Sequence, residues 1–236
     1  RGFLVSGSPL GALSGRFMQH GPLLRLADAE KKRLNLLYLA KWAEADGTPD
    51  AKDGTHATYH AEMRDTMRAL GFNVEAASKF DRLYTNHNYD FCVTMLNRGG
   101  ATNSEMLGPL LCAYNNIPFF GASPILRGLG DDKHLMKLAV RARGVATPDS
   151  MIIRRGGMAI TEPDFEWKSL IVKPNASSAS WGIGAYDNWA EAKAHAERLL
   201  SDGHDVIIEN FVDGYEIAVP IIGSNGPWVL PPMRFY

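Results

Sequence analysis

The sequence predicts an α/β protein, with a parallel sheet covered by helices in its first half and an α+β domain in its second half. Two observations support this prediction. Short apolar runs alternate with helix-period segments over 31–121, and such alternation is typical of a parallel sheet. The last strand-like segments, over 206–235, are separated by glycine turns, which favours antiparallel pairing. The second domain is expected to be incomplete at its C-terminal end.

The first half divides into an extension and an α/β domain. Residues 1–30 mix Gly, Ser and Pro without a sustained period and are predicted to be irregular. Over 31–121 the expected elements are a strand at 34–42, a helix with Met63, Met67 and Leu70 on one face, strands at 72–76 and 89–96, a helix at 105–114 and a strand at 117–121. Gly71 is expected to end the first of these helices as a C-terminal cap.

The second half is predicted to hold a central subdomain at 122–208 and the start of a further subdomain at 209–236. Asp132 can cap a helix whose apolar face carries Leu135, Leu138, Ala139 and Ala142, and Gly144 should end that helix. The remaining expected elements are strands at 151–154 and 169–173, a helix at 189–200 introduced by Asn188 and Glu191, and strands at 206–209, 216–222 and 228–235.

Composition narrows the classes of function. Lys and Arg (25) nearly balance Asp and Glu (26), so no basic stripe for nucleic acid is expected. Cys92 and Cys112 each lie in an apolar run and are predicted to be buried reduced thiols of a cytoplasmic protein. No apolar stretch is as long as a membrane span. Because the sequence starts at Arg1 and stops at Tyr236 inside a predicted strand, we expect it to be part of a longer polypeptide.

One segment predicts a phosphate-binding loop. In LIVKPNASSASWGIG, over 170–184, an apolar strand ends at Lys173 and is followed by small hydroxylated residues and glycines. Small residues allow backbone N–H groups to approach phosphate oxygens, and the lysine would supply a positive charge. The alternative is a strand-end lysine before a surface turn.

A second segment predicts an adenine slot. In VIIENFVDGYE, over 206–216, an apolar strand leads to Glu209, then to Phe211 and Val212, and after a turn to Glu216. An adenine ring requires an apolar slot, polar groups at its edge and an acceptor for its amino group, and Glu209 to Val212 could provide them. The alternative is that both glutamates are solvated charges at strand ends.

Taken together, three segments resemble the ATP-grasp enzymes, and in particular the D-alanine–D-alanine ligase branch. They are the loop segment above, IENFVDGYEIAVPIIG and IPFFGASPILRGLGDDKHLMKLAVRARGVATPD, and they span about 117–236. The resemblance implies that 31–121 is the N-terminal (pre-ATP-grasp) α/β domain. It also implies a set of site residues: Lys133 and Lys173 at the nucleotide phosphates, Ser177, Ser178, Ser180 and Gly182 in the covering loop, Glu209 at the adenine amino group, Phe211 and Val212 in the adenine slot, and Glu216 at the ribose. Lys133, Lys173 and Ser180 would take part in catalysis.

The family mechanism would form an amide bond through an acylphosphate, from a small-molecule carboxylate and an amine, with ATP and Mg²⁺ as cofactors. The magnesium ligands of the family lie downstream of Tyr236, and no residue of this sequence is assigned to them. The segment LNRGGATNSE, at 96–105, lacks the family's histidine, and the early glycine-rich turn is replaced at 43–56. An ATP-grasp ligase for a different amino acid, peptide or small carboxylate and a non-catalytic ATP-binding module are therefore retained as alternatives. Lys137 is predicted to be solvated, and a homodimer is left open.

Overall fold

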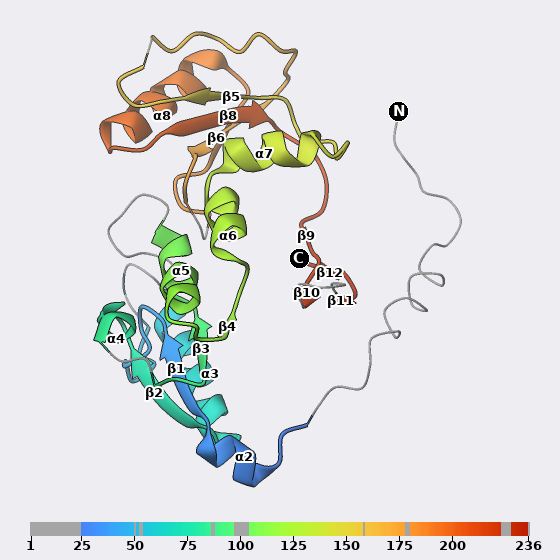
Figure 1. The fold of residues 1–236 in the computed structure, drawn as a ribbon. Coiled ribbons are helices and arrows are strands. Elements are labelled where there is room, and N and C mark those ends of the chain that lie inside the picture. The colour runs from blue at the N-terminus through green and yellow to red at the C-terminus, as the bar shows by residue number, and fades with distance from the viewer. Residues whose placement is uncertain are drawn as a thin grey trace. The chain divides into compact units, whose positions relative to one another are not determined.

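The computed structural model describes residues 25–49, 51, 54–85, 88–96, 104–157, 159–177, 180–222 and 228–235. These residues fall into two compact units (Figure 1). Ala27–Phe211 forms the larger unit, and the residues from Val212 onward belong to the smaller one. Each unit is described by itself below.

The larger unit contains a four-stranded sheet whose order is β2-β1-β3-β4. Its strands are β1 (Asn35–Leu39), β2 (Asn73–Ala77), β3 (Phe91–Thr94) and β4 (Phe119–Phe120). The accompanying helices are α2 (Asp28–Arg33), α3 (His56–Ala69), α4 (Asp81–Thr85), the 3-10 helix η1 (Ser104–Met106) and α5 (Leu107–Tyr114). All three strand pairs are parallel, so the predicted parallel sheet is confirmed.

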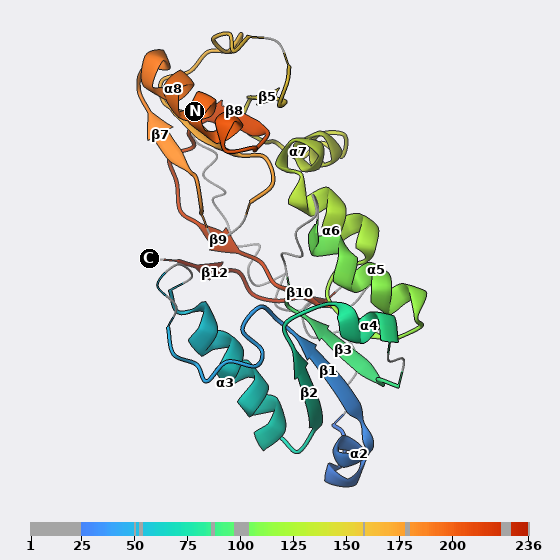
Figure 2. The same ribbon diagram turned by 90° about the vertical axis from the view of Figure 1, so that its left-hand side faces the viewer.

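Helices cover both faces of this sheet (Figure 2). Leu37 and Leu39 of β1 pack in one core with residues of α4 and α5, while Leu36 and Tyr38 pack in a second core with residues of α3. A strand that is buried on both faces needs a continuous apolar run, which is what made β1 recognisable in the sequence. Cys92 and Cys112 are free and buried, as predicted.

Helix α3 ends as predicted, and of the three apolar residues predicted to share one face the last is exposed. Met63 and Met67 pack against the core, whereas Leu70 is 54% exposed. Leu70 is the C-cap residue, and Gly71 follows with a φ of 94°, so the chain turns away from the helix at this point. Leu70 therefore does not share the burial of Met63 and Met67.

Two consecutive helices follow β4. Helix α6 (Pro124–Asp131) was not predicted, although Ser123 caps it and proline occupies its first turn. Helix α7 (Lys133–Arg141) is capped by Asp132 as predicted, with the Leu135 amide donating to Asp132 Oδ1 over 2.9 Å. The predicted apolar face of α7 is not buried: Leu135 is 44% exposed and Leu138 is 50% exposed.

A second four-stranded sheet, of order β5-β8-β6-β7, completes the larger unit. Its strands are β5 (Ser150–Ile153), β6 (Leu170–Pro174), β7 (Gly184–Tyr186) and β8 (Val206–Asn210), and all pairs are antiparallel. Helix α8 (Trp189–Ser201) packs on one face through Ala192, Ala196 and Leu199. As predicted, Asn188 caps α8, accepting a 2.9 Å hydrogen bond from the Glu191 amide. Strand β7 had been predicted as loop.

The smaller unit contains two short antiparallel pairs. Strand β9 (Ile217–Ala218) pairs with β12 (Met233–Arg234), and β10 (Ile221–Ile222) pairs with β11 (Trp228–Val229). The predicted antiparallel pairing of this segment is confirmed, although the strands are shorter than expected. In the described part of the chain, no helix has the length and apolar character needed to cross a membrane.

Candidate nucleotide site

Two neighbouring strands, β6 and β8, bring a lysine and a glutamate together on one face of the second sheet. Leu170 and Val172 of β6, like Val206 and Ile208 of β8, point into the core beneath α8. Side chains alternate along a strand, so Lys173 and Glu209 emerge on the opposite face. Glu209 lies opposite Ile171 in the register, which places it diagonally from Lys173, and the Lys173 ammonium donates to Glu209 Oε1.

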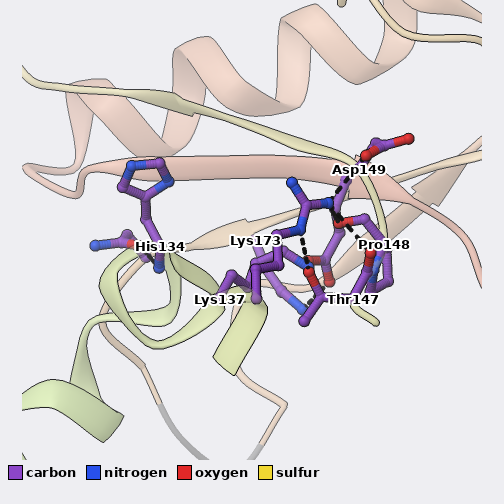
Figure 3. Close-up of polar contacts among 9 residues, drawn as sticks. His134, Lys137, Thr147, Pro148, Asp149 and Lys173 are labelled. Carbon is purple, nitrogen blue, oxygen red and sulfur yellow. Dashed lines mark hydrogen bonds and ion pairs between the residues drawn. The ribbon is translucent and has the colours of Figure 1, made fainter. Parts of the chain in front are cut away.

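Helix α7 adds a second lysine to this pair. Lys137 Nζ lies 2.8 Å from Glu209 Oε2, and the two side chains are only 12% and 11% exposed. Figure 3 shows Lys137 and Lys173 side by side between the helix and the sheet. The expectation that Lys137 is solvated was therefore wrong. A signal was present, because residues four apart share a helix face and Lys137 is four residues after Lys133.

The two lysines keep Glu209 ionised. Burial acts to raise the pKa of this carboxyl group, but the hydrogen bonds and positive charges of Lys137 and Lys173 outweigh burial, and the pKa lies below its ordinary value. Each oxygen of Glu209 has one lysine partner. A buried carboxylate held in this way is a fixed acceptor for a hydrogen-bond donor, and a lysine ammonium is a partner for an anionic ligand.

The first turn of α7 is joined to the segment that follows β6. The Lys133 ammonium donates to the Ser177 carbonyl over 2.7 Å. The Lys133 amide donates to the Asn175 carbonyl over 3.1 Å, and the His134 amide donates to Asn175 Oδ1 over 2.9 Å. Asn175 is only 2% exposed. Its side chain therefore accepts from one of the amides that the start of a helix leaves without a helical partner.

We expect Asn175→Ala to lower the free energy of unfolding by about 1 to 2 kcal/mol, because the part-buried His134 amide would lose the acceptor that the buried Asn175 side chain provides. Chemical denaturation measures this loss. Asn73→Ala is the matched control, since it removes an asparagine whose 2.6 Å hydrogen bond to Asn35 lies at the surface, and it should cost less than about 0.5 kcal/mol. Equal losses in the two variants would show that the Asn175 contact does not anchor α7.

The other predicted site residues are distributed as follows. Ser180 and Gly182 occupy a turn with φ values of 56° and 72°, and the backbone of Ser180 is in a region that non-glycine residues rarely adopt. Phe211, at the end of the larger unit, is 49% exposed. Val212 and Glu216 belong to the smaller unit. Ser178 lies outside the described residues. The roles assigned to these residues stay predictions.

Sequence comparisons relate the second half of the chain to one family. Residues 141–235 match the family model described as the D-ala D-ala ligase C-terminus. The chain is 30% identical to an uncharacterized protein of Sinorhizobium fredii, over 54% of this chain and 37% of that protein. It is 32% identical to a D-alanine–D-alanine ligase of Ralstonia pickettii, over 46% of this chain and 33% of that protein. The chain thus spans about a third of either relative.

Solved structures show the same fold. The D-alanine–D-alanine ligase of Bacillus anthracis aligns with a TM-score of 0.65 at 19% identity, covering 85% of this chain and 64% of that one. The D-alanyl-alanine synthetase A of Vibrio cholerae aligns with a TM-score of 0.66 at 14% identity, covering 87% of this chain and 68% of that one. The predicted resemblance to D-alanine–D-alanine ligases is confirmed in sequence and in fold.

Proposed function

We propose that this chain carries the nucleotide-binding part of an ATP-dependent carboxylate–amine ligase of the D-alanine–D-alanine ligase type. The observation that carries the proposal is the buried cluster of Lys137, Lys173 and Glu209, two of whose members lie within the segment that matches the ligase family model. A Bacillus anthracis ligase of the same fold has been solved in complex with ATP, which supports ATP as the ligand. Residues 31–121, 122–208 and 209–236 would be its successive domains.

In this proposal the two ends of ATP are bound by different groups. Glu209 accepts a hydrogen bond from the adenine amino group, Phe211 and Val212 lie against the adenine ring, and Glu216 binds the ribose hydroxyls. The phosphates are bound by two lysines, Lys133 and Lys173, and by the loop that contains Ser177, Ser178, Ser180 and Gly182. The ammonium of Lys173 supports the phosphate assignment, and the Glu209 carboxylate, fixed by a lysine on each oxygen, supports the adenine assignment.

The proposed reaction has two steps. A carboxylate oxygen attacks the γ-phosphorus of ATP, the bond to the bridging oxygen breaks, and ADP leaves an acylphosphate behind. An amine then attacks the acyl carbon, and phosphate leaves as the amide bond forms. The protein's contribution is mainly positioning and charge stabilisation, which suits lysines and loop amides and requires no side-chain nucleophile.

Mg²⁺, which would enter with ATP and offset phosphate charge, stays a prediction from the resemblance. Within the described ranges no group of three or more His, Cys, Asp or Glu side chains could hold a metal ion. The relatives are named D-alanine–D-alanine ligases, so D-alanine is the first substrate to test, as both the carboxylate and the amine. A cytoplasmic location, where ATP is available, is also part of the proposal.

Phosphate release from ATP tests the proposed reaction. With ATP and Mg²⁺ present, adding D-alanine to the purified full-length protein should raise the rate of phosphate release, and D-alanyl-D-alanine should accumulate. A protein that binds ATP but releases no phosphate with any small carboxylate would instead be the non-catalytic ATP-binding module. Release with a different carboxylate would identify a ligase for another substrate.

The proposal also predicts base selectivity. ATP and ADP should bind at least about tenfold more tightly than GTP, because guanine presents a carbonyl oxygen where adenine presents its amino group, and that oxygen would face the Glu209 carboxylate. Calorimetric titration with the three nucleotides measures the difference. Equal affinity for GTP and ATP would rule out Glu209 as the acceptor of the adenine amino group.

A further inference from the structure

Lys137 has no part in the proposed binding of ATP, yet it forms an ion pair with the buried Glu209. Its ammonium lies 2.8 Å from Glu209 Oε2, and its side chain is 12% exposed. We infer that Lys137 is a positioning residue, which holds the Glu209 carboxylate in the orientation that recognises an adenine amino group. The inference rests on the proposed function and extends it to a residue outside the predicted site.

Glu209 retains hydrogen-bond acceptor sites for the amino group of the nucleotide. Lys173 binds one oxygen of Glu209 and Lys137 binds the other. An ionised carboxylate has about four acceptor sites on its two oxygens, so the two lysines leave about two sites for an incoming N–H donor. Bonds to both oxygens also fix the plane of the carboxylate, which a single lysine partner would leave free to rotate.

The charges explain why a second lysine is needed. Glu209 is buried, and a buried carboxylate without a cationic partner is costly. In the proposed complex Lys173 also binds the phosphates, so its ammonium is shared between two anions. Lys137 binds no phosphate in that complex and stays bound to Glu209. The carboxylate therefore stays ionised and oriented while Lys173 binds the nucleotide.

Both ends of α7 are anchored, which fixes the place from which Lys137 reaches Glu209. At the N-terminal end, Lys133 and His134 donate backbone hydrogen bonds to Asn175. At the C-terminal end, the Arg141 guanidinium binds the segment before β5. Its contacts, drawn in Figure 3, are the Thr147 hydroxyl at 2.7 Å, the Thr147 carbonyl at 3.1 Å, the Pro148 carbonyl at 2.8 Å and Asp149 Oδ1 at 2.9 Å.

The test compares two nucleotides that differ only in the group that Glu209 is proposed to recognise. ATP and purine riboside triphosphate, which lacks the 6-amino group, are titrated calorimetrically into the full chain and its variants. Lys137→Gln should weaken ATP binding by about tenfold and leave purine riboside triphosphate nearly unchanged. Lys137→Arg, which keeps the positive charge, should retain most of the preference for ATP. Lys193→Gln, on the exposed side of α8, is the control and should change neither affinity.

Four outcomes would overturn the inference. Equal weakening of both nucleotides would show that Lys137 acts on the phosphates or on the fold, and an unchanged preference for ATP would show that Glu209 does not depend on Lys137.

If Lys137→Gln does not fold, Lys137→Gln is combined with Glu209→Gln, so that no buried carboxylate loses its partner. The double variant should bind ATP as Glu209→Gln alone does, and further weakening would contradict the inference. A wild-type chain that binds neither nucleotide would instead overturn the proposed function itself, and this inference with it.

Discussion

Lys173→Met is expected to weaken ATP binding by about tenfold to a hundredfold and to leave adenosine binding nearly unchanged. Hydrogen bonds to charged groups contribute about 1.5 to 3 kcal/mol each, and a lysine that contacts phosphates gives up this contribution when it becomes methionine. Adenosine has no phosphates, so it makes no phosphate contact that the substitution could remove. Calorimetric titration of both ligands into the wild type and the variant measures the contrast.

The ion pair between Lys173 and Glu209 adds a condition to this prediction. Glu209 is the proposed partner of the adenine ring, so removing Lys173 could disturb adenosine as well. Lys137 still binds the second oxygen of Glu209, and this contact should keep the carboxylate ionised in the variant. If adenosine weakened as much as ATP, Lys173 would act on the adenine end of the site and the phosphate assignment would fail.

The control must be a lysine away from the cluster. Lys137 was predicted to be solvated, but its contact with Glu209 disqualifies it. Lys193 on α8 is 43% exposed and pairs only loosely with Glu197, at 3.8 Å, four residues along the same helix. Lys193→Met removes the same charge from the chain and should leave ATP affinity unchanged, so it corrects for any general effect of net charge.

Local patterns in the sequence predicted most of the elements that hold the site. The continuous apolar runs before Lys173 and Glu209 predicted β6 and β8. In the folded sheet, Val172 and Ile208 face the core, so Lys173 and Glu209 lie on the opposite face. The caps at Asp132 and Asn188 were also recognisable, since both depend on a side chain and an amide only three residues apart. The Ser123–Pro124 start of α6 carried the same kind of signal and was overlooked.

Contacts between distant segments could not be derived in this way. Helix periodicity shows that Leu135 and Leu138 share a face of α7, but it does not show whether another element covers that face, and none of the described elements buries them. The ion pair of Lys137 and Glu209 joins residues 72 positions apart, and the hydrogen bond from the His134 amide to Asn175 joins residues 41 positions apart. Both depend on where α7 is placed against the sheet, which is a property of the tertiary structure.

The largest expected effect on stability is that of Gly182→Ala, which should lower the free energy of unfolding by about 2 to 5 kcal/mol. Gly182 has a φ of 72°, a backbone conformation that costs an alanine about 1 to 2 kcal/mol. A Cβ atom added at this position would also lie 2.9 Å from Pro174 Cγ and 3.3 Å from Leu199 Cδ2. Pro174 is fully buried and cannot move aside freely, so overpacking adds about 1 to 3 kcal/mol.

Gly156→Ala separates the two contributions, because Gly156 has a similar φ of 70° and an added Cβ would meet no described atom within 4 Å. This control should cost only the backbone part, about 1 to 2 kcal/mol. Chemical denaturation of both variants measures the difference, which is the packing cost at Gly182. Equal losses would mean that the turn can shift away from Pro174. A larger loss at Gly182 would show that the fold of the predicted phosphate loop requires this glycine whether or not it contacts a phosphate.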